Sequence, residues 1–434
     1  YKAKNLPSGL SIDANRGMIT GKVNKKGTYE VPLTVTNAKG KDEKTLKIIV
    51  GDKIALTPPM GWNNWNAYGK NFDEKTIRET AQAFVEHELI EHGWTFVNMD
   101  DGWQGKRGGK YNAIMPNEKF TDMKKICDDI HSMGLKVGIY STPWKLSYAG
   151  YIGGSADTPD GKTPYEYNDY QSRFGVYPFY KEDAKQWAAW GIDYLKYDWN
   201  PNDLAHTVVT KEALLESGRD IIFSLSNSSP ISEVDDLSKN ANAWRTTGDI
   251  IDTWGSVYSI TQQMADWPEY SRPGHWNDAD MLVVGWLGAG HGHLHPTRLT
   301  ATEQYTHISL WAMFSSPLLL GCDLTKLDEF TRSLLTNDEV IAINQDPLGK
   351  GAERIYQDGL IEIWKKDLAD GSTAIALCNF KLHQAKITLD WQLAGLTGKS
   401  MVRDVWRQKD LGRYEGSFTR TIPGHGALLL RIGK

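Results

Sequence analysis

The chain has 434 residues, a length that suits two or three domains better than one. Its net charge of −5 and pI of about 6.2 give no support for a nucleic-acid partner or an anionic membrane surface. No apolar run approaches the roughly 20 residues of a membrane-spanning helix, so we expect no membrane partner. The three cysteines, Cys127, Cys322 and Cys378, lie far apart without metal-ligand spacing and are expected to be small buried side chains.

Residues 1–52 are expected to form a small antiparallel β module. Short β-prone runs alternate with turn signals, the runs at 18–20, 29–35 and 46–50 and the turns at 14–17, 24–27 and 37–40. Residues 6–10 and 17–21 resemble segments of the immunoglobulin-like modules that precede bacterial carbohydrate-active enzymes. Because a fold alone does not give a function, we interpret this module as a spacer rather than a sugar-binding domain.

Residues 53–345 change to a repeated pattern of strand, loop and helix, which predicts a (β/α)8 barrel in the α/β class. Eight β-prone runs are expected to be the barrel strands, at 60–62, 94–99, 135–140, 192–197, 220–225, 243–246, 276–282 and 317–321. Helical spacing of apolar residues predicts helices between them, at 73–93, 123–133, 183–190, 211–217 and 302–314. Catalytic groups of this fold lie at the carboxyl ends of the strands.

Residues 346–434 lose the helical pattern and are expected to form a C-terminal antiparallel β-sandwich. Short strands are predicted at 360–364, 373–378, 385–389, 401–404 and 427–432. We expect this domain to pack against the barrel and to add stability without chemistry.

Carboxylates follow several of the predicted barrel strands. The strand ending in Lys-Tyr-Asp delivers Asp198, and other strands lead to Asp100, Asp101, Asp249, Asp278 and Asp280. An isolated buried carboxylate is costly, and Lys196, two residues earlier on the same side of the strand, is the expected partner of Asp198. A single strand-end Asp is often a structural ion pair, but several on one rim predict an acidic pocket.

An acidic pocket of this kind suits glycoside hydrolysis. The reaction needs one ionised carboxylate and a second carboxyl that holds a proton near neutral pH. A double-displacement enzyme keeps the two groups only about 5 Å apart, because one of them attacks the sugar carbon. The 17 Trp and 19 Tyr residues fit stacking on sugar rings but also fit a large core. Spacing alone does not say which Asp does which job.

Seven motifs in residues 56–345 occur in the order of one enzyme family. They are Pro58-Pro59-Met60-Gly61-Trp62-Asn63 with Trp65, Asp100-Asp101-Gly102-Trp103, Gly138-Ile139-Tyr140, Tyr194-Leu195-Lys196-Tyr197-Asp198, Trp244-Arg245 with Gly248-Asp249-Ile250, Trp276-Asn277-Asp278-Ala279-Asp280-Met281-Leu282, and Leu310-Trp311-Ala312 with Ser316-Pro317-Leu318. By these motifs the segment resembles glycoside hydrolase family 27, the family of α-galactosidases and α-N-acetylgalactosaminidases. The resemblance implies a barrel followed by a β-sandwich. It also implies a retaining exo-glycosidase that releases terminal α-D-galactosyl residues through a covalent glycosyl-aspartate.

The resemblance further implies the role of each site residue. Asp198 matches the nucleophile, and Asp249 matches the general acid/base. The positions that match substrate-binding residues are Trp65, Asp100, Asp101, Tyr140, Lys196, Arg245 and Asp280. Asp100 and Asp101 would accept hydrogen bonds from the 4- and 6-hydroxyls of galactose, whereas Asp280 and Met281 have the alternative role of shaping the wall. The physics agrees, because the charge of Lys196 favours ionised Asp198 and desolvation of the Asp249 loop would raise the pKa of that carboxyl.

Two departures from the family pattern bear on the pocket. Family members often have a disulfide between the loop after the third strand and the residues after the nucleophile; the corresponding positions here are approximately Tyr148 and Asn200, so we expect packing to hold the site. After the fifth strand, α-galactosidases of the family usually have a Glu-Trp pair that limits the pocket at the sugar 2-position. This chain has Ser226, Asn227 and Ser229 there, which leaves α-N-acetylgalactosamine open as a substrate.

Other interpretations remain open. A β-L-arabinopyranoside has the ring arrangement of galactose without the 6-hydroxymethyl group, and a sugar-binding protein on an inactive barrel is a further alternative. The presence of both Asp198 and Asp249 argues against an inactive barrel.

No cofactor is expected, because two carboxylates supply the covalent and acid/base steps. His291, His293 and His295 alternate as metal ligands can, but no carboxylate or Cys cluster accompanies them, so we expect a solvated rim and no metal. The expected partner is a carbohydrate, and the substrate class favours export to the periplasm or the cell exterior. The sequence does not indicate an oligomeric state.

Overall fold

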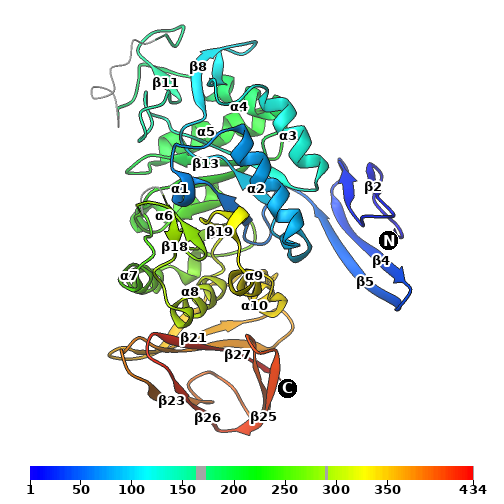
Figure 1. The fold of residues 1–434 in the computed structure, drawn as a ribbon, viewed down its shortest axis with the longest axis vertical. Helices are drawn as coiled ribbons and strands as arrows, with labels where there is room; N and C mark the ends of the chain where they lie inside the picture. Colours follow the sequence, from blue (N-terminus) through cyan, green and yellow to red (C-terminus); the bar gives the residue numbers. More distant parts are fainter. Residues whose placement is uncertain (163–172, 289–291, 434) are drawn as a thin grey trace. The chain divides into compact units, whose positions relative to one another are not determined.

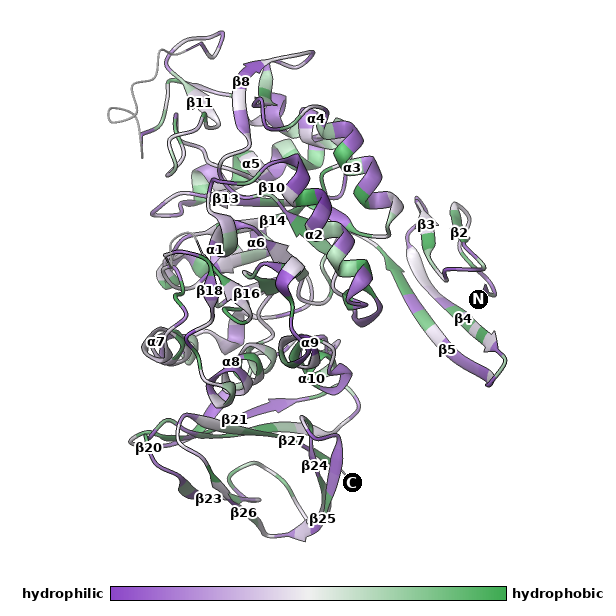
Figure 2. Cartoon of the chain, viewed as in Figure 1, coloured by the Kyte–Doolittle hydropathy of each residue, from purple (hydrophilic) through white to green (hydrophobic). Residues whose placement is uncertain are grey.

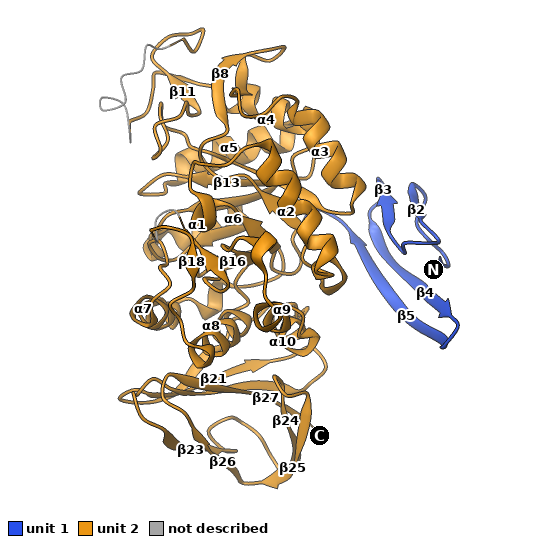
Figure 3. Cartoon of the chain, in the orientation of Figure 1, with its two compact units in different colours: residues 1–54 blue, residues 55–434 orange. Residues whose placement is uncertain are grey.

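The structure is a computed structural model that describes residues 1–162, 173–288 and 292–433. The chain forms two compact units, residues 1–54 and residues 55–434 (Figure 3). Since the second unit contains both the barrel and the sandwich, we keep the three predicted domains, 1–52, 53–345 and 346–434, as a proposal.

The first unit consists of a three-stranded antiparallel sheet in the order β1-β4-β5 and a separate hairpin of β2 and β3. Its strands are β1 (Lys2–Ala3), β2 (Leu10–Ile12), β3 (Ile19–Gly21), β4 (Gly27–Asn37) and β5 (Gly40–Val50). The long strands β4 and β5 pair along their whole length, from Gly27 opposite Val50 to Asn37 opposite Gly40. The Val31 side chain is buried, while most other side chains of the unit are exposed.

The second unit is built around a parallel sheet that closes into a barrel. In the described part of the chain its eight strands are β6 (Met60–Asn63), β7 (Phe96–Asn98), β10 (Lys136–Ser141), β13 (Tyr194–Asp198), β14 (Ile222–Ser226), β15 (Ala243–Arg245), β16 (Trp276–Asp278) and β19 (Leu318–Leu320). Neighbours in space follow one another in sequence, and a parallel bridge between Leu282 and Leu320 joins the last edges. All eight coincide with predicted runs, because buried parallel strands have nearly continuous apolar sequences.

Helices follow the strands around the barrel (Figure 1). They are α1 (Trp65–Tyr68), α2 (Glu74–Glu86), α3 (Met123–Ser132), α4 (Tyr180–Trp190), α5 (Leu204–Glu216), α6 (Val234–Asn240), α7 (Trp254–Met264) and α8 (Ala301–Phe314), with α9 (Glu329–Leu335), α10 (Asp338–Asn344) and the 3₁₀ turns η1 (Leu89–His92), η2 (Ile231–Glu233), η3 (Pro268–Tyr270) and η5 (Leu324–Lys326). Side chains cap several of them; Asp73 accepts from the Thr76 amide at the start of α2. Figure 2 shows hydrophobic and hydrophilic sides on α2 and α3, as expected for helices that cover a sheet.

The helix predicted over 73–93 is interrupted. α2 ends at Glu86, and Glu88 adopts a left-handed conformation with φ of 61° before η1 begins. A left-handed residue cannot continue an α-helix, so the apolar spacing that seemed continuous covers a helix and a separate 3₁₀ turn.

Short antiparallel strand pairs lie in the loops that follow three of the barrel strands. They are β8 (Gln104–Gly108) with β9 (Ala113–Pro116), β11 (Ser155–Ala156) with β12 (Tyr177–Pro178), and β17 (Trp286–Leu287) with β18 (His295–Pro296). An ion pair ties the first of them to α4, since Arg107 Nη1 lies 2.7 Å from Asp183 Oδ1 and both side chains are 1% exposed. The same carboxylate accepts the Ile114 amide.

The C-terminal part is an antiparallel β-sandwich. One sheet has the order β20-β21-β22-β27-β24-β25, and the other pairs β23 with β26. The strands are β20 (Glu353–Asp358), β21 (Ile361–Asp367), β22 (Thr373–Asn379), β23 (Ala385–Asp390), β24 (Lys399–Asp404), β25 (Lys409–Glu415), β26 (Ser417–Ile422) and β27 (Gly426–Gly433).

α8 lies between the barrel and the sandwich (Figure 1). Apart from Tyr305, its side chains are buried from Glu303 to Phe314, because both neighbours cover it. The buried Lys366 ammonium on β21 donates to Ser315 Oγ at 2.6 Å, just after α8, and to the Ile343 carbonyl on α10. The sandwich therefore packs on the barrel through shared core and hydrogen bonds, as expected from the sequence.

Candidate active site

The predicted site residues come from the carboxyl ends of neighbouring barrel strands. Asp198 is the last residue of β13 and pairs in register with Ser226, the last residue of β14. Asp100 follows β7, Arg245 ends β15, and Asp280 follows β16 by two residues. Because all these strands run in parallel, the barrel brings their ends to one rim.

Asp198 is nearly buried, with 7% of the residue exposed. Its Oδ2 accepts a hydrogen bond from the Tyr140 hydroxyl at 3.0 Å, whereas Oδ1 has no hydrogen-bond partner among the described residues. Burial raises the pKa of Asp198 to about 7, against the lowering effects of the Lys196 charge and the Tyr140 hydrogen bond. One carboxylate oxygen is thus held in place while the other is available to a reactant.

Lys196 is not the direct partner of Asp198 that the sequence led us to expect. Its Nζ lies 2.7 Å from Asp100 Oδ2, and the Asn63 side chain donates to the same oxygen at 2.7 Å. Lys196 and Asp198 do share one side of β13, but the long lysine side chain reaches across to the end of β7. Although burial opposes it, the charge of Asp100 raises the pKa of Lys196 above its ordinary value, so Lys196 remains a cation.

Asp100 and Asp101 are both buried and well supplied with donors. The Asp101 amide donates to Asp100 Oδ1 at 2.8 Å, and the Asn64 side chain accepts the Asp100 amide at 2.7 Å. Asp101 accepts from Gln104 Nε2 at 3.0 Å and from the Ala149 amide at 2.8 Å. Burial raises the pKa of Asp101 to about 6 despite these hydrogen bonds. The two carboxylates are therefore rigid acceptors.

Arg245 connects the remaining acidic residues. Its Nη1 lies 3.0 Å from Asp280 Oδ1, and its Nη2 donates to Asp249 Oδ1 at 3.2 Å. Asp280 also accepts the Ile250 amide at 2.7 Å, which ties the end of β16 to the loop that carries Asp249. Burial raises the pKa of Asp280, while the Arg245 charge lowers it.

The desolvation predicted for Asp249 is not seen, since 67% of its side chain is exposed. The residue lies in the loop after β15 rather than on a strand, so the barrel wall does not cover it. Besides burial and the charge of Asp100, the charge of Asp249 raises the pKa of Asp198, so the two carboxylates are within electrostatic range of each other.

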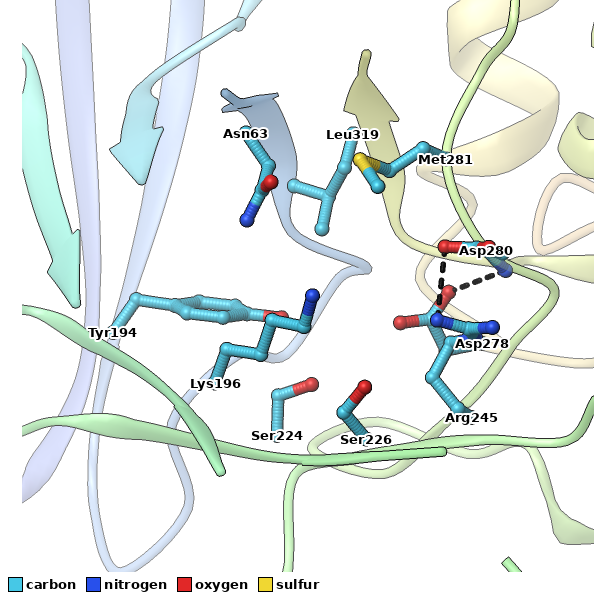
Figure 4. A pocket seen from close by; sticks show the side chains of 10 residues that line it. All are labelled: Asn63, Tyr194, Lys196, Ser224, Ser226, Arg245, Asp278, Asp280, Met281 and Leu319. Carbon is cyan, nitrogen blue, oxygen red and sulfur yellow. Dashed lines mark hydrogen bonds and ion pairs between the residues drawn. The ribbon is translucent and has the colours of Figure 1, made fainter. Parts of the chain in front are cut away.

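A small cavity of about 20 Å³ lies among these strand ends, large enough for one water molecule. It is lined by Asn63, Tyr194, Lys196, Ser224, Ser226, Arg245, Asp278, Asp280, Met281 and Leu319. Figure 4 shows the Lys196 ammonium and the group of Asp278, Arg245 and Asp280 directed toward a common space.

Four predicted binding residues, Trp65, Asp100, Asp101 and Tyr140, do not line this cavity, and neither do Asp198 and Asp249. Trp65 begins α1 directly after β6, and its amide donates to Asn63 Oδ1 at 2.9 Å. Tyr140 is buried on β10, with its hydroxyl on Asp198.

Sequence reasoning did not assign a role to four polar residues of the cavity, Asn63, Tyr194, Ser224 and Asp278. Three of them precede an assigned residue by two positions, since Tyr194 precedes Lys196, Ser224 precedes Ser226 and Asp278 precedes Asp280. The period-two alternation of a strand was the signal that pointed to them. Burial raises the pKa of Asp278 to about 6, and its Oδ1 accepts the Asp280 amide at 2.8 Å.

Within the described residues, nothing supports His293 and His295 as metal ligands. There, no group of three His, Cys, Asp or Glu side chains is placed to hold a metal ion. His295 Nδ1 donates to the Pro296 carbonyl at 2.7 Å, whereas His291 lies outside the described residues. The three cysteines are buried and unpaired, as expected.

Family models match most of the chain. A model described as alpha galactosidase A matches residues 57–168 and 166–346, and one described as alpha galactosidase C-terminal beta sandwich domain matches residues 358–432. A third model, of an Ig domain, matches residues 1–51. The predicted fold class, including the N-terminal immunoglobulin-like module, is confirmed.

Relatives extend over nearly the whole length. Alpha-galactosidase 2 of Arabidopsis thaliana is 36% identical, over 92% of this chain and 95% of its own. Alpha-galactosidase of Cyamopsis tetragonoloba is 33% identical, over 90% and 89%. Among solved structures, alpha-galactosidase I from Mortierella vinacea matches with a TM-score of 0.77 and 30% identity, over 88% of this chain and 98% of its own. A family 27 β-L-arabinopyranosidase from Geobacillus stearothermophilus matches with a TM-score of 0.78 and 28% identity, over 88% and 98%. The chain therefore belongs to glycoside hydrolase family 27, the alpha-galactosidase family.

Proposed function

We propose that this glycoside hydrolase is a retaining exo-acting α-galactosidase that removes terminal α-D-galactosyl residues. The observation that carries the proposal is the state of Asp198. One of its oxygens is fixed by the Tyr140 hydroxyl, and the other, although nearly buried, has no partner among the described residues. A nucleophilic carboxylate needs this combination of fixed orientation and an available oxygen.

The two carboxylates divide the work of double displacement. Asp198 attacks the anomeric carbon and forms a covalent glycosyl-aspartate, while Asp249 gives its proton to the departing glycosidic oxygen. Asp249 then takes a proton from water, which attacks the anomeric carbon and releases Asp198. The exposure of Asp249 suits this role, since the acid/base must reach both a leaving group and water.

Recognition of galactose rests on charged groups that are held rigidly. Asp100 and Asp101 are the proposed acceptors for the 4- and 6-hydroxyls, and the ion pair with Lys196 holds the Asp100 side chain in place. Arg245 and Asp280 form an ion pair at the side proposed for the 2- and 3-hydroxyls. A site built to pair an axial 4-hydroxyl discriminates against glucose, because glucose would leave these buried groups unpaired. Trp65 and Tyr140 are the proposed aromatic walls.

Ser226 is the proposed determinant at the sugar 2-position, because it lines the cavity at the strand ends. Of the other two candidates, Ser229 Oγ is engaged with Asn202 Oδ1 at 2.6 Å, and the Asn227 carbonyl accepts from Asn200. Neither residue lines this cavity.

The test compares initial rates on an aryl α-D-galactoside, an aryl α-N-acetyl-D-galactosaminide and an aryl β-L-arabinopyranoside. We expect a clear preference for the galactoside, loss of activity in Asp198→Ala, and release of α-galactose as the first anomer in an NMR time course. Preference for either other sugar would overturn the substrate assignment. Activity on none of them would favour an inactive sugar-binding protein, and full activity of Asp198→Ala would overturn the mechanism.

The proposed partner is a glycan with a terminal α-galactosyl group. No helix within the described residues has the length and apolarity to cross a bilayer. The substrate class makes the periplasm or the cell exterior the proposed place of action.

A further inference from the structure

The loop after β10 carries an exposed aromatic residue to the rim of the site. Tyr148 has 39% of its surface exposed, and its ring contacts the buried Trp144 edge-to-face with centroids 5.0 Å apart. The next residue, Ala149, donates its amide to Asp101 Oδ2 at 2.8 Å. The loop is closed by a bond from the Ser147 amide to the Tyr151 carbonyl at 2.8 Å. Tyr148 is therefore anchored on both sides.

The Tyr148 hydroxyl meets a second rim segment at Asn227. The Asn227 side chain hydrogen-bonds that hydroxyl, and its carbonyl accepts from Asn200 Nδ2 at 2.9 Å. Asn227 and Ser228 have left-handed backbones, with φ of 101° and 55°, so the chain turns sharply after β14. Three segments, which follow β10, β13 and β14, thus meet at Asn227. Hydrogen bonds here hold the positions where the family resemblance pointed to a disulfide.

Tyr148 also lies close to both catalytic carboxylates. Burial, together with the charges of Asp198 and Asp249, raises the pKa of Tyr148 to about 12. The phenol is therefore within electrostatic range of both carboxylates, and the Ala149 amide bond to Asp101 holds its loop beside the site. The Tyr148 ring is absent from the lining of the deep cavity that contains Lys196, Arg245 and Asp280. Tyr148 is thus exposed, near both carboxylates and outside the deep pocket. The bond between galactose and its leaving group must cross this part of the rim.

We propose that the face of Tyr148 forms a binding platform for the leaving group, for which the matching class is a pyranose sugar. This inference rests on the proposed α-galactosidase function and adds the residue that selects what galactose is attached to. The apolar C–H face of a pyranose stacks on an aromatic ring, and a ring held by Trp144 and Asn227 loses little entropy on binding.

Tyr148 touches only the leaving group in this arrangement, so its effect must depend on what leaves. The test measures kcat/KM for an α-1,6-linked galactosyl-glucose disaccharide and for α-galactosyl fluoride, whose leaving group has no sugar ring. We expect Tyr148→Ala to lower kcat/KM about fivefold to tenfold for the disaccharide and by no more than about twofold for the fluoride. Tyr148→Phe keeps the ring and is expected to stay within about twofold of the parent on both substrates.

Tyr356→Ala serves as the matched control, because Tyr356 on β20 of the sandwich is 40% exposed and far from the barrel strand ends in the fold. It should change neither rate. Equal losses of Tyr148→Ala on both substrates, or no loss on either, would overturn the platform. The same selective loss in Tyr148→Phe would also overturn it, since the hydroxyl rather than the ring would then be responsible. A parent enzyme that cleaves neither substrate would refute the proposed function itself, and this inference with it.

Discussion

Replacing Asp198 by asparagine is expected to stabilise the protein while it removes the nucleophile. Burial raises the pKa of Asp198 to about 7, against an ordinary value of 3.8. The unfolded chain therefore ionises this carboxyl at a pH where the folded protein still holds the proton, and folding stability falls as pH rises from about 4 to 7. Above pH 7 the folded protein carries the full free-energy cost of the buried charge. Below about pH 4 this cost vanishes, because the carboxyl is protonated in both the folded and the unfolded state.

The size of the effect follows from the pKa difference. At about 1.4 kcal/mol per pKa unit, ionised Asp198 costs on the order of 4 kcal/mol at neutral pH and above. Asparagine has the same shape and no charge, and its side-chain oxygen can still accept the Tyr140 hydroxyl. With about 2 cal/mol/K of unfolding entropy per residue, a barrel-and-sandwich unit of this length should melt roughly 5 °C higher.

The assay is thermal unfolding at fixed scan rate, at pH 8 and at pH 4, for the parent, Asp198→Asn and Asp249→Asn. The variant at Asp249 makes the same chemical change at a side chain that is 67% exposed, so its melting temperature should stay near that of the parent. Asp198→Asn should melt higher at pH 8 and equal to the parent at pH 4. If it melts at or below the parent at pH 8, the reasoning from burial is refuted.

Three further predictions concern the pocket and its support. Tyr140→Phe removes a hydrogen bond that lowers the pKa of Asp198. The acid limb of the plot of kcat/KM against pH should therefore move to higher pH by up to about one unit. An unmoved limb would mean that this hydrogen bond does not lower the pKa of the nucleophile. Asp183→Asn leaves the buried Arg107 cation without its partner and should cost about 3–5 kcal/mol by denaturant unfolding, whereas a loss below about 1 kcal/mol would contradict the importance of this pair. Ser226→Glu should lower the rate on the N-acetylgalactosaminide relative to the galactoside, and unaltered relative rates would exclude this loop as the determinant at the 2-position.

Local patterns were sufficient to predict the architecture and the positions of the carboxylates at the strand ends. Apolar runs between glycine-terminated helices gave all eight barrel strands, and Asp198 could be placed at the end of β13 because strand ends are marked by the change to polar residues. The break after Glu86 escaped prediction, since apolar spacing carries no information about a left-handed residue between two helical pieces.

The tertiary structure was needed to decide which side chains of the site pair with each other. Alternation along β13 puts Lys196 and Asp198 on one side, but Asp100 from β7 comes within 2.7 Å of the lysine and becomes its partner. Tyr148 and Asn227 lie in different loops, and nothing in their local sequence indicates that one hydrogen-bonds the other.

By itself the sequence determined the strands, the order of the barrel and the residue types at its rim, because apolar periodicity and strand-end polarity are properties of neighbouring residues. Only the tertiary structure decided which carboxylate is buried, which is exposed, and which cation each one meets. Asp198 and Asp249 show the difference, since two aspartates that look alike in sequence are 7% and 67% exposed, the first as a residue and the second as a side chain. Burial and long-range pairing set the charge state of each carboxyl, and both arise only when distant segments close the barrel.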